Sequence, residues 1–336
     1  MTHRAFRLRR RPEGSLGADD LDLVDEAPAS PADGEALVRT RLLSVDPANR
    51  LWMSDVRGYQ PPVPVGAVME GIGAGEVVES RREDLRPGDL VTGRLGWQEL
   101  SRIPAGRRLR VLPRPLRAPL SAYLGVLGHT GLTAVVGLEL GRPAPGETMV
   151  VSAAAGAVGS VAGQLGRADG VRVVGIAGGP GKCRHVVEDL GFDACVDRRA
   201  EDWREELAAA TPGGVDVDFE NVGGPIMDEV LLRLNVGARV VLCGMISQYD
   251  ASASGRPWRG QEQIAQILMQ RATMHGFIAG DHAHRMDAAT ERLAALLEAG
   301  RLRHDETVVE GFERLPEALG LLFAGANTGK LLVQVA

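Results

Sequence analysis

Val150-Val151-Ser152-Ala153-Ala154-Ala155-Gly156-Ala157-Val158-Gly159-Ser160 is the most informative stretch of this 336-residue chain. An apolar run passes through a glycine turn into small and apolar residues, which predicts a buried strand, a tight turn and a helix. Gly156 would let the backbone approach a pyrophosphate, whose charge the helix N-terminus would hold, and Gly159 would let the helix pack closely on the strand. Ala154 stands where a strict G-x-G-x-x-G pattern has its first glycine. The stretch alone therefore favours a dinucleotide site only weakly over a turn built for close packing.

Strands and helices alternate after this turn. Short apolar runs predict strands, and apolar residues spaced three and four apart predict helices. The expected strands are 148–152, 171–176, 194–197, 215–219, 238–243 and 273–278. The expected helices lie near 157–168, 182–190, 201–210, 224–234, 259–271 and 284–299. This alternation indicates an α/β fold with a Rossmann-type, doubly wound parallel sheet.

The end of the second expected strand distinguishes the nicotinamide cofactors. An NAD enzyme places an acid on the ribose 2′-hydroxyl about 20 residues past the glycine turn. This chain has no Asp or Glu from Gly170 to Val187. Instead, Lys182 and Arg184 open the next helix, and Arg198-Arg199 follow the third strand. Any single one of these cations is more often a solvated surface charge. Together they suit a 2′-phosphate, so we expect NADP(H) rather than NAD.

Composition is that of a soluble enzyme. Hydrophobic residues make up 44%, charged residues 24%, and the formal net charge is -6, which leaves no broad basic face for nucleic acid. The sequence has no apolar run long enough for a membrane span and no signal-peptide core, so we expect a cytoplasmic protein. The arginines at 7 and 9–11 resemble a nucleic-acid arm, but the alternation over 5–9 favours an edge strand with one wet face.

Cysteine and histidine usage argues against a metal site. Cys183, Cys195 and Cys243 are odd in number and lack C-x-x-C spacing, so neither a disulfide framework nor a structural zinc cluster is expected. We expect buried or unreactive thiols. The seven histidines are scattered, and their spacing predicts no metal ligands.

The residue pattern at the two ends of the chain differs from that of the middle. Up to about residue 120, short apolar runs are broken by Gly and Pro, as in 66–78, which predicts a compact β-rich domain. The stretches 306–310 and 329–335 again predict strands. We therefore expect one domain from 1–121 and 299–336, a nucleotide domain over 122–298, and a ligand cleft between them.

Short motifs of one known family run nearly end to end along the chain. They are Leu43-Ser44-Val45-Asp46-Pro47, Gly131-Leu132-Thr133-Ala134, Val151 to Gly159, Asn221-Val222-Gly223-Gly224, Leu242 to Tyr249, Gly276-Phe277-Ile278 and Asn327-Thr328-Gly329-Lys330-Leu331. In these motifs the chain resembles the zinc-independent medium-chain dehydrogenases/reductases, in the branch of prostaglandin reductase, leukotriene dehydrogenase and curcumin-reductase-like enzymes. The resemblance implies a GroES-like catalytic domain plus a Rossmann domain, commonly in a homodimer. It also implies NADPH-dependent reduction of the carbon–carbon double bond of an enone or enal.

The resemblance also assigns cofactor residues. It places Ala155, Gly156, Ala157, Val158 and Gly159 at the pyrophosphate and Lys182 at the 2′-phosphate. Arg198 stands where most relatives have Tyr, and an Arg suits a phosphate equally well. Around the nicotinamide and its ribose the resemblance places Asn221, Cys243, Gly244, Met245, Ile246, Ser247, Phe277, Ile278 and Asn327. Asn327 has an alternative interpretation as a turn-forming Asn before Thr-Gly.

Two residues are candidates for moving or donating a proton. Negative charge gathers on the carbonyl oxygen of an enone during reduction, and the α-carbon then takes a proton. Tyr249 lies in a polar, glycine-flanked loop and is the first candidate donor, although a packing role stays open. His129 stands where relatives have Met, and is either a proton donor or a neutral His satisfied by backbone.

The substrate side departs from the family pattern. Relatives usually read Val-Asp-Pro-Tyr-Met-Arg where this chain has Val45-Asp46-Pro47-Ala48-Asn49-Arg50. Loss of the Tyr hydroxyl at Ala48 would leave a larger or differently shaped pocket, as for a bulky biosynthetic substrate. The remaining pocket candidates are Asn49, Trp52, Tyr59 and Trp97, and for the aromatic three ordinary packing is an equal alternative.

Other activities stay open at this point. Within oxidoreductases they are quinone reduction and zinc-free alcohol oxidation. The loss of Tyr at position 48 slightly favours a cofactor-binding protein with a non-reductive role, whereas the glycine turn, Tyr249 and Asn327 favour the ene-reductase.

Overall fold

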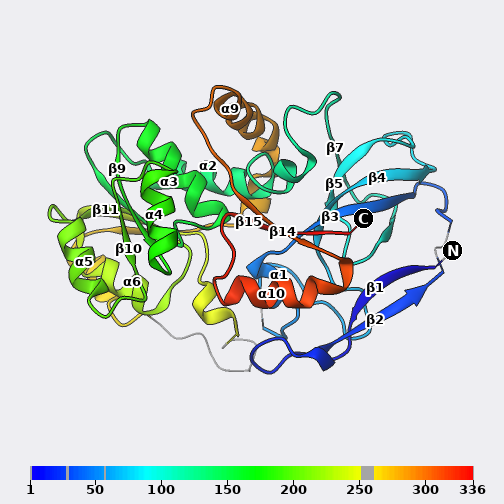
Figure 1. Cartoon of the computed structure of the whole chain (residues 1–336), viewed down its shortest axis with the longest axis horizontal. Coiled ribbons are helices and arrows are strands. Elements are labelled where there is room, and N and C mark those ends of the chain that lie inside the picture. The colour runs from blue at the N-terminus through cyan, green and yellow to red at the C-terminus, as the bar shows by residue number, and fades with distance from the viewer. Residues whose placement is uncertain (1, 28–29, 57, 251–260, 336) are drawn as a thin grey trace. The chain divides into compact units, whose positions relative to one another are not determined.

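The chain forms two units (Figure 1), and the computed structural model describes residues 2–27, 30–56, 58–250 and 261–335. The first unit comprises Met1–Leu124, Tyr249–Pro257 and Glu306–Ala336, and the second comprises Gly125–Gln248 and Trp258–Asp305. Residues 299–305 belong to the second unit, whereas we expected them in the first. Gln164 ties this segment down, because its amide donates to the Arg303 carbonyl at 2.8 Å and accepts from the Arg303 N–H at 2.8 Å.

The second unit is built on a six-stranded parallel sheet in the order β10-β9-β8-β11-β12-β13. Its strands are β8 (Thr148–Ser152), β9 (Arg172–Ala177), β10 (Ala194–Asp197), β11 (Val215–Glu220), β12 (Leu234–Leu242) and β13 (Thr273–Gly276). The first strand of this unit, β8, lies in the middle of the sheet. Strands β9 and β10 then extend the sheet to one edge and β11 to β13 extend it to the other, as expected for a doubly wound fold. All six expected strands are present, and β13 ends two residues earlier than expected.

Helices cover both faces of this sheet. They are α2 (His129–Gly141), α3 (Ala157–Ala168), α4 (Pro180–Glu188), α5 (Trp203–Ala210), α6 (Gly224–Leu231), α8 (Ala265–Met269) and α9 (Met286–Glu298), with 3-10 turns η3 (Ile246–Gln248) and η4 (Ala279–Arg285). Leu207 of α5 and Met227 of α6 pack with Val174 and Val240 in one core on one face. On the other face, the Phe219 ring lies against Gly137 of α2, and the Val186 side chain of α4 lies over Gly175.

Two helix expectations need correction. The helix expected over 259–271 falls partly outside the described residues, and within them only α8 forms. Helix α2 was not expected, because nearly all of its side chains are buried and the sequence shows no polar face there. In the described part of the chain, every helix is too short or too polar to span a lipid bilayer.

The first unit is mainly β structure. Its larger sheet has the order β14-β15-β3-β4-β5-β7, with β6 paired to β3. The strands are β3 (Ala36–Ser44), β4 (Ile72–Ser80), β5 (Leu90–Arg94), β6 (Leu100–Ile103), β7 (Arg110–Val111), β14 (Glu306–Glu310) and β15 (Lys330–Gln334). Strand β15 pairs with β3, so the C-terminal segment returns to the N-terminal unit as expected.

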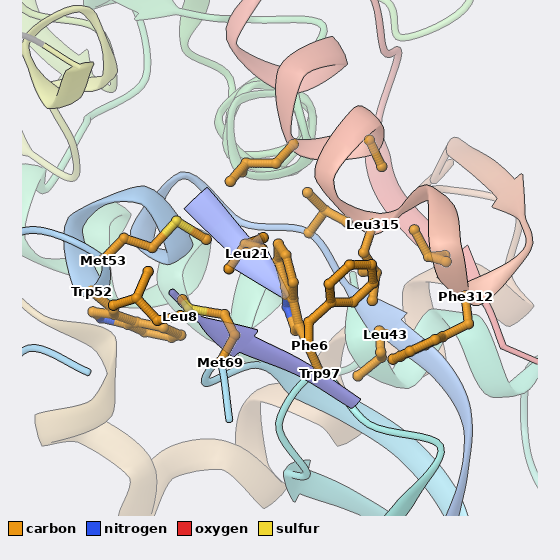
Figure 2. Close-up of a cluster of buried hydrophobic side chains, with 14 of the residues drawn as sticks. Phe6, Leu8, Leu21, Leu43, Trp52, Met53, Met69, Trp97, Phe312 and Leu315 are labelled. Atoms are coloured by element: carbon orange, nitrogen blue, oxygen red, sulfur yellow. The ribbon is translucent and has the colours of Figure 1, made fainter. Parts of the chain in front are cut away.

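A hairpin and short helices complete this unit. Strands β1 (His3–Leu8) and β2 (Leu21–Glu26) pair antiparallel, and the helical elements are η1 (Ala18–Asp20), α1 (Pro47–Trp52), η2 (Leu120–Leu124), η5 (Phe312–Arg314) and α10 (Leu315–Phe323). Arg7 of β1 pairs with Glu26, which agrees with the strand expected over 5–9. Figure 2 shows the main core of this unit, where Phe6 lies between Trp97 and Phe312 at ring distances of 6.0 and 5.2 Å.

Candidate cofactor and active site

The turn between β8 and α3 has the close backbone packing that its glycines permit. A Cβ atom at position 159 would lie 2.5 Å from the Ala153 carbonyl oxygen, and one at position 156 would lie 3.0 Å from the same atom. Gly156 is the N-cap of α3, and Ala153 holds a positive φ of 51°. Ala154 replaces the first glycine without strain, because it is buried and its N–H donates to the Ile176 carbonyl at 3.0 Å. The N-terminus of α3 therefore lies at the end of β8, where a phosphate would meet its N–H groups.

Three cations converge at the end of β9. The Arg198 and Arg199 side chains both come within 3.3 Å of where a Cβ on Gly178 would lie. Burial lowers the pKa of Lys182, and the positive charges of Arg199 and Arg198 lower it further. Lys182 is therefore held close to two like charges, an arrangement that a bound anion would stabilise. These residues fit a 2′-phosphate, and the neutral end of β9 at Ala177 offers no acid to a ribose hydroxyl.

Sequence reasoning missed an acid at the end of β11. Glu220 is wholly buried, and its Oε1 accepts hydrogen bonds from the Ser152 hydroxyl at 3.0 Å and the Gly223 N–H at 2.6 Å, and from the Val222 N–H. Burial raises its pKa, and these hydrogen bonds oppose the shift. The available signal was an acid directly before Asn221 at a strand end, which is where ligands bind in open α/β sheets.

Hydrogen bonds hold Asn221 and the loop after β12 at the carboxyl ends of β8 and β11. The Asn221 side chain donates to the Ser152 carbonyl at 2.7 Å. The Glu220 carbonyl accepts from the N–H groups of Cys243 at 2.9 Å and Gly244 at 3.1 Å. The Ser247 hydroxyl donates to the Val222 carbonyl at 2.6 Å. The structure thus brings together the carboxyl ends of β8, β11 and β12 with the residues expected around the nicotinamide.

Four more members of this expected set belong to the same unit. Met245 packs its side chain where a Cβ on Gly223 would lie, and Ile246 opens η3. Phe277 and Ile278 follow β13 and are half-buried, with the Phe277 ring against Gly137 of α2. Burial raises the pKa of the Cys243 thiol to about 12, so this cysteine is a neutral packing group.

In the first unit, four of the five expected pocket residues lie on or beside α1, and three of them are grouped around Trp52. Ala48 and Trp52 lie one turn apart on this helix, so their side chains share a face. The Trp52 indole N–H donates to the Tyr59 hydroxyl at 3.0 Å, and Arg94 lies over the Trp52 ring at 5.4 Å. Tyr59 is 48% exposed, so this ring is available to a ligand.

The other two pocket residues are structural, and their expected role is corrected. Asn49 is wholly buried because its Oδ1 accepts from the Asp46 N–H at 2.8 Å and its amide donates to the Glu70 carbonyl at 3.1 Å, which caps α1. Trp97 is also wholly buried in the core of Figure 2, where a Cβ on Gly71 would lie 2.6 Å from its ring. Neither side chain is free to contact a substrate.

The C-terminal Asn-Thr-Gly segment also makes defined contacts. The Asn327 amide donates to the Gly329 carbonyl at 3.0 Å, and its side chain is buried. Nearby, Lys330 is buried and its ammonium donates to Asp46 at 2.8 Å and to the Val45 carbonyl at 3.0 Å. This ion pair ties β15 to the start of α1.

The two proton-donor candidates lie in different units. His129 is exposed and is the first residue of α2, in the second unit. Tyr249 is half-buried and follows η3 directly. Among the described residues, no group of three or more His, Cys, Asp or Glu side chains could hold a metal ion.

Comparison with known proteins identifies the family. Residues 4–111 match the family described as the N-terminal domain of oxidoreductase, and residues 157–295 match the zinc-binding dehydrogenase family. The chain is 41% identical to the NADPH-dependent curcumin reductase of Escherichia coli over 99% of its own length and 97% of that protein. It is 36% identical to the NADP-dependent 2-alkenal reductase of Nicotiana tabacum over 90% and 88% of the two chains.

A solved structure agrees over the whole fold. CurA from Vibrio vulnificus in complex with NADPH superposes with a TM-score of 0.93 at 39% identity, covering 99% of each chain. The chain therefore belongs to the medium-chain dehydrogenase/reductase family, in the zinc-independent branch that includes the curcumin and 2-alkenal reductases.

Proposed function

We propose that this protein uses NADPH to reduce the carbon–carbon double bond of α,β-unsaturated ketones and aldehydes. The proposal rests on three cations that converge near Gly178, at the end of β9: Lys182, Arg198 and Arg199. They occur in a chain whose relatives are named NADPH-dependent curcumin reductase and NADP-dependent 2-alkenal reductase. Cations at this position select a cofactor that bears a 2′-phosphate.

The phosphate half of the cofactor would be held by the second unit alone. The N–H groups of the turn from Ala155 to Gly159 would take the pyrophosphate, and the three cations would take the 2′-phosphate. Asn221 and the loop 243–247 would hold the nicotinamide ribose, because Glu220 and Ser152 fix both segments to the carboxyl ends of β8 and β11. When bound, NADPH supplies the hydride that reaches the β-carbon of the substrate.

The chain's own chemical task is to orient the double bond and to stabilise charge on the carbonyl oxygen. We assign the hydrogen bond to that oxygen to the Tyr249 hydroxyl, which directly follows the nicotinamide loop in sequence. His129 is the second candidate for delivering the proton to the α-carbon, because its side chain is exposed at the start of α2.

The α1 face of the first unit would hold the organic part of the substrate. Ala48, Trp52 and Tyr59 combine a small side chain with two aromatic rings, a surface suited to a flat conjugated molecule. The missing side-chain volume at Ala48 favours a bulkier enone over a short enal. Restoring the family's aromatic residue with Ala48→Tyr should therefore shift preference toward short enals.

A substrate panel tests this proposed function directly. The purified protein is given NADPH or NADH with an aryl enone, a short enal, a quinone or an alcohol, and the products are identified by mass spectrometry. Formation of the saturated ketone with NADPH and far more slowly with NADH is the expected result. NADPH consumption with the quinone alone, or product formation with NADH at an equal rate, would overturn it.

We also propose that the protein is a homodimer paired through β13. This strand stands at one end of the six-stranded sheet. Beside it, Ile264, Leu268 and Met269 of the α8 segment are 50%, 75% and 59% exposed, and Val236 of β12 is 64% exposed. A sheet edge beside exposed apolar side chains is suited to pairing with a second copy. Light scattering of the wild type and of Leu268→Asp tests this, and a wild-type monomer would contradict it.

A cytoplasmic location is proposed as well. The three cysteines are all free thiols, as is usual for proteins in a reducing compartment. Fractionation of cells that express the native gene, with immunodetection of the chain, tests the location. Recovery from a membrane or secreted fraction would contradict it.

A further inference from the structure

Two of the three cysteines are side by side in the nucleotide unit. Cys183 lies on α4 and Cys195 is the second residue of β10. Their thiols hydrogen-bond to each other, and both side chains are half-buried, so small reagents can reach them. Cys243 has no part in the contact, because it follows the end of β12, where the charge of Glu220 acts on its thiol.

Regular secondary structure holds the pair together. Val196 points into the apolar core that contains Val174, so Cys195, its neighbour on β10, points to the opposite face of the sheet. Cys195 pairs in register with Gly175, and the Val186 side chain of α4 lies over Gly175. Cys183 lies one helical turn before Val186, and therefore faces the same strand pair. The contact is fixed by strand register and helix phase.

The same elements carry the 2′-phosphate cluster. Lys182 is the immediate neighbour of Cys183 in α4. Two residues after Cys195, the Asp197 carboxylate accepts from the Gly179 N–H at 2.7 Å and from the Arg199 N–H at 3.0 Å. A change in the spacing of α4 and β10 would therefore move Lys182 relative to Arg198 and Arg199.

The hydrogen bond makes the two thiols unequal. The Cys195 thiol donates to the Cys183 sulfur, which lowers the pKa of Cys183, although burial and the charge of Asp197 oppose this. The same hydrogen bond, reinforced by burial, raises the pKa of Cys195. Cys183 is consequently the more acidic thiol of the pair, and Cys195 lies beside it as the second, resolving thiol.

We propose that Cys183 and Cys195 form a peroxide-sensitive dithiol site that closes to a disulfide and thereby weakens NADPH binding. The Cys183 thiolate attacks one oxygen of hydrogen peroxide, which breaks the O–O bond, leaves a sulfenic acid on Cys183 and releases one water after protonation. The Cys195 sulfur then attacks the Cys183 sulfur and displaces the second water. Two thiols are oxidised by two electrons in total, and one peroxide is reduced to two waters.

Formation of the disulfide changes the geometry of the cation cluster expected at the 2′-phosphate. Bonded sulfurs stand about 2.05 Å apart, much closer than hydrogen-bonded thiols, so disulfide formation should draw α4 and β10 toward each other. NADPH depends on the spacing of Lys182 from the arginines, whereas NADH lacks the 2′-phosphate that needs it. Because coupling between two sites is reciprocal, bound NADPH should also slow closure. The inference uses cofactor binding alone, and so does not depend on which double bond is reduced.

The test oxidises the full-length protein with hydrogen peroxide and measures intact mass, the cross-linked peptide and the Kd of each cofactor. The expected product has lost about 2 Da through a Cys183–Cys195 link. Its Kd for NADPH should be raised at least about fivefold, that for NADH should change far less, and dithiothreitol should reverse the effect. Cys243→Ser keeps the pair and should lose the same mass.

Serine variants of the pair separate the steps. Cys195→Ser should form a sulfenic acid on Cys183 that dimedone traps, with no disulfide, whereas Cys183→Ser should form neither. Differential alkylation of the wild type gives the same assignment without any variant. A disulfide that includes Cys243, unreacted thiols under peroxide that oxidises free cysteine, or a closed form with unchanged NADPH affinity would overturn the proposal.

Discussion

The guanidinium of Arg50, only 1% exposed, donates from Nε to Oδ1 of Asp250 at 3.0 Å. The same side chain donates to the Ser54 hydroxyl at 3.2 Å and to the carbonyl oxygens of Pro12 and Gly14. Burial lowers the pKa of Arg50, and the Asp250 carboxylate opposes that shift. The ion pair thus fixes the residue that follows Tyr249 against α1.

Removing the Asp250 carboxylate should leave the buried Arg50 charge without its paired acid. We expect Asp250→Ala to lower the free energy of unfolding by about 2 kcal/mol, because Asp250 is partly solvated while Arg50 is not. Urea denaturation followed by Trp fluorescence measures this loss. Asp22→Ala is the control, since Asp22 pairs with Arg9 at 3.7 Å on the surface, where about 0.5 kcal/mol is the expected effect. Equal losses would show that burial of Arg50 adds nothing.

The phosphate cluster gives a prediction on cofactor choice. Lys182→Ala together with Arg198→Ala should raise the Kd for NADPH by tenfold or more, because each charge-assisted hydrogen bond contributes about 1.5–3 kcal/mol. The Kd for NADH should change by less than about twofold. Titration of both cofactors by calorimetry measures the two values. Arg184→Ala is the matched control, because Arg184 is exposed on the same helix and, contrary to the expectation from sequence, is not among the three cations that converge at the end of β9. Equal losses for the two cofactors would remove these residues from the 2′-phosphate.

Local patterns made the nucleotide half predictable from sequence. The β8–turn–α3 segment is contiguous, and its period changes from strand to helix within ten residues or so. The absence of an acid after β9 and the presence of Lys182 can both be seen without any tertiary information. Helix α2 escaped this approach because it is buried on almost every side, which removes the polar face that marks a helix.

Contacts between distant segments could not be predicted. Asn49 and Trp97 carry the residue types of a ligand pocket, but Asp46, Glu70 and Gly71 enclose them. The neighbouring position of Cys183 and Cys195 depends on the register of β10 on β9, and their sequence spacing carries no such signal. Glu220 likewise accepts the Ser152 hydrogen bond only because β8 and β11 pair in the folded sheet.

Turnover should depend on one hydroxyl. Tyr249→Phe should lower kcat by tenfold or more, because it removes the hydrogen-bond donor proposed for the carbonyl oxygen, and should leave the Kd for NADPH within about twofold. Steady-state kinetics with an enone, beside cofactor titration, separates the two effects. Tyr123→Phe is the control, because this buried hydroxyl accepts a hydrogen bond from the Arg117 N–H at 3.1 Å. Unchanged kcat in Tyr249→Phe would remove this hydroxyl from the chemistry.

The last prediction concerns a second acid in β11. Asp218 is wholly buried, and neither carboxylate oxygen has a hydrogen-bond partner among the described residues. Its register partners Val150 and Val240 belong to the apolar core on that face of the sheet. Burial raises the pKa of Asp218 well above its ordinary value, and the neighbouring charge of Glu220 raises it further. The folded protein therefore holds this proton at pH values where the unfolded chain releases it.

This sign fixes how stability should change with pH. A raised folded-state pKa stabilises the fold fully below the ordinary aspartate value of about 4, and that stability is lost as pH rises toward the raised value, by about 1.4 kcal/mol for each pH unit. Asp218→Asn cannot ionise, so its unfolding free energy relative to wild type should increase from pH 5 to pH 8. Urea denaturation at several pH values measures the difference. Asp33→Asn, at a fully exposed side chain, should show no such trend, and a flat difference for Asp218→Asn would mean that the carboxylate is ionised in the folded core.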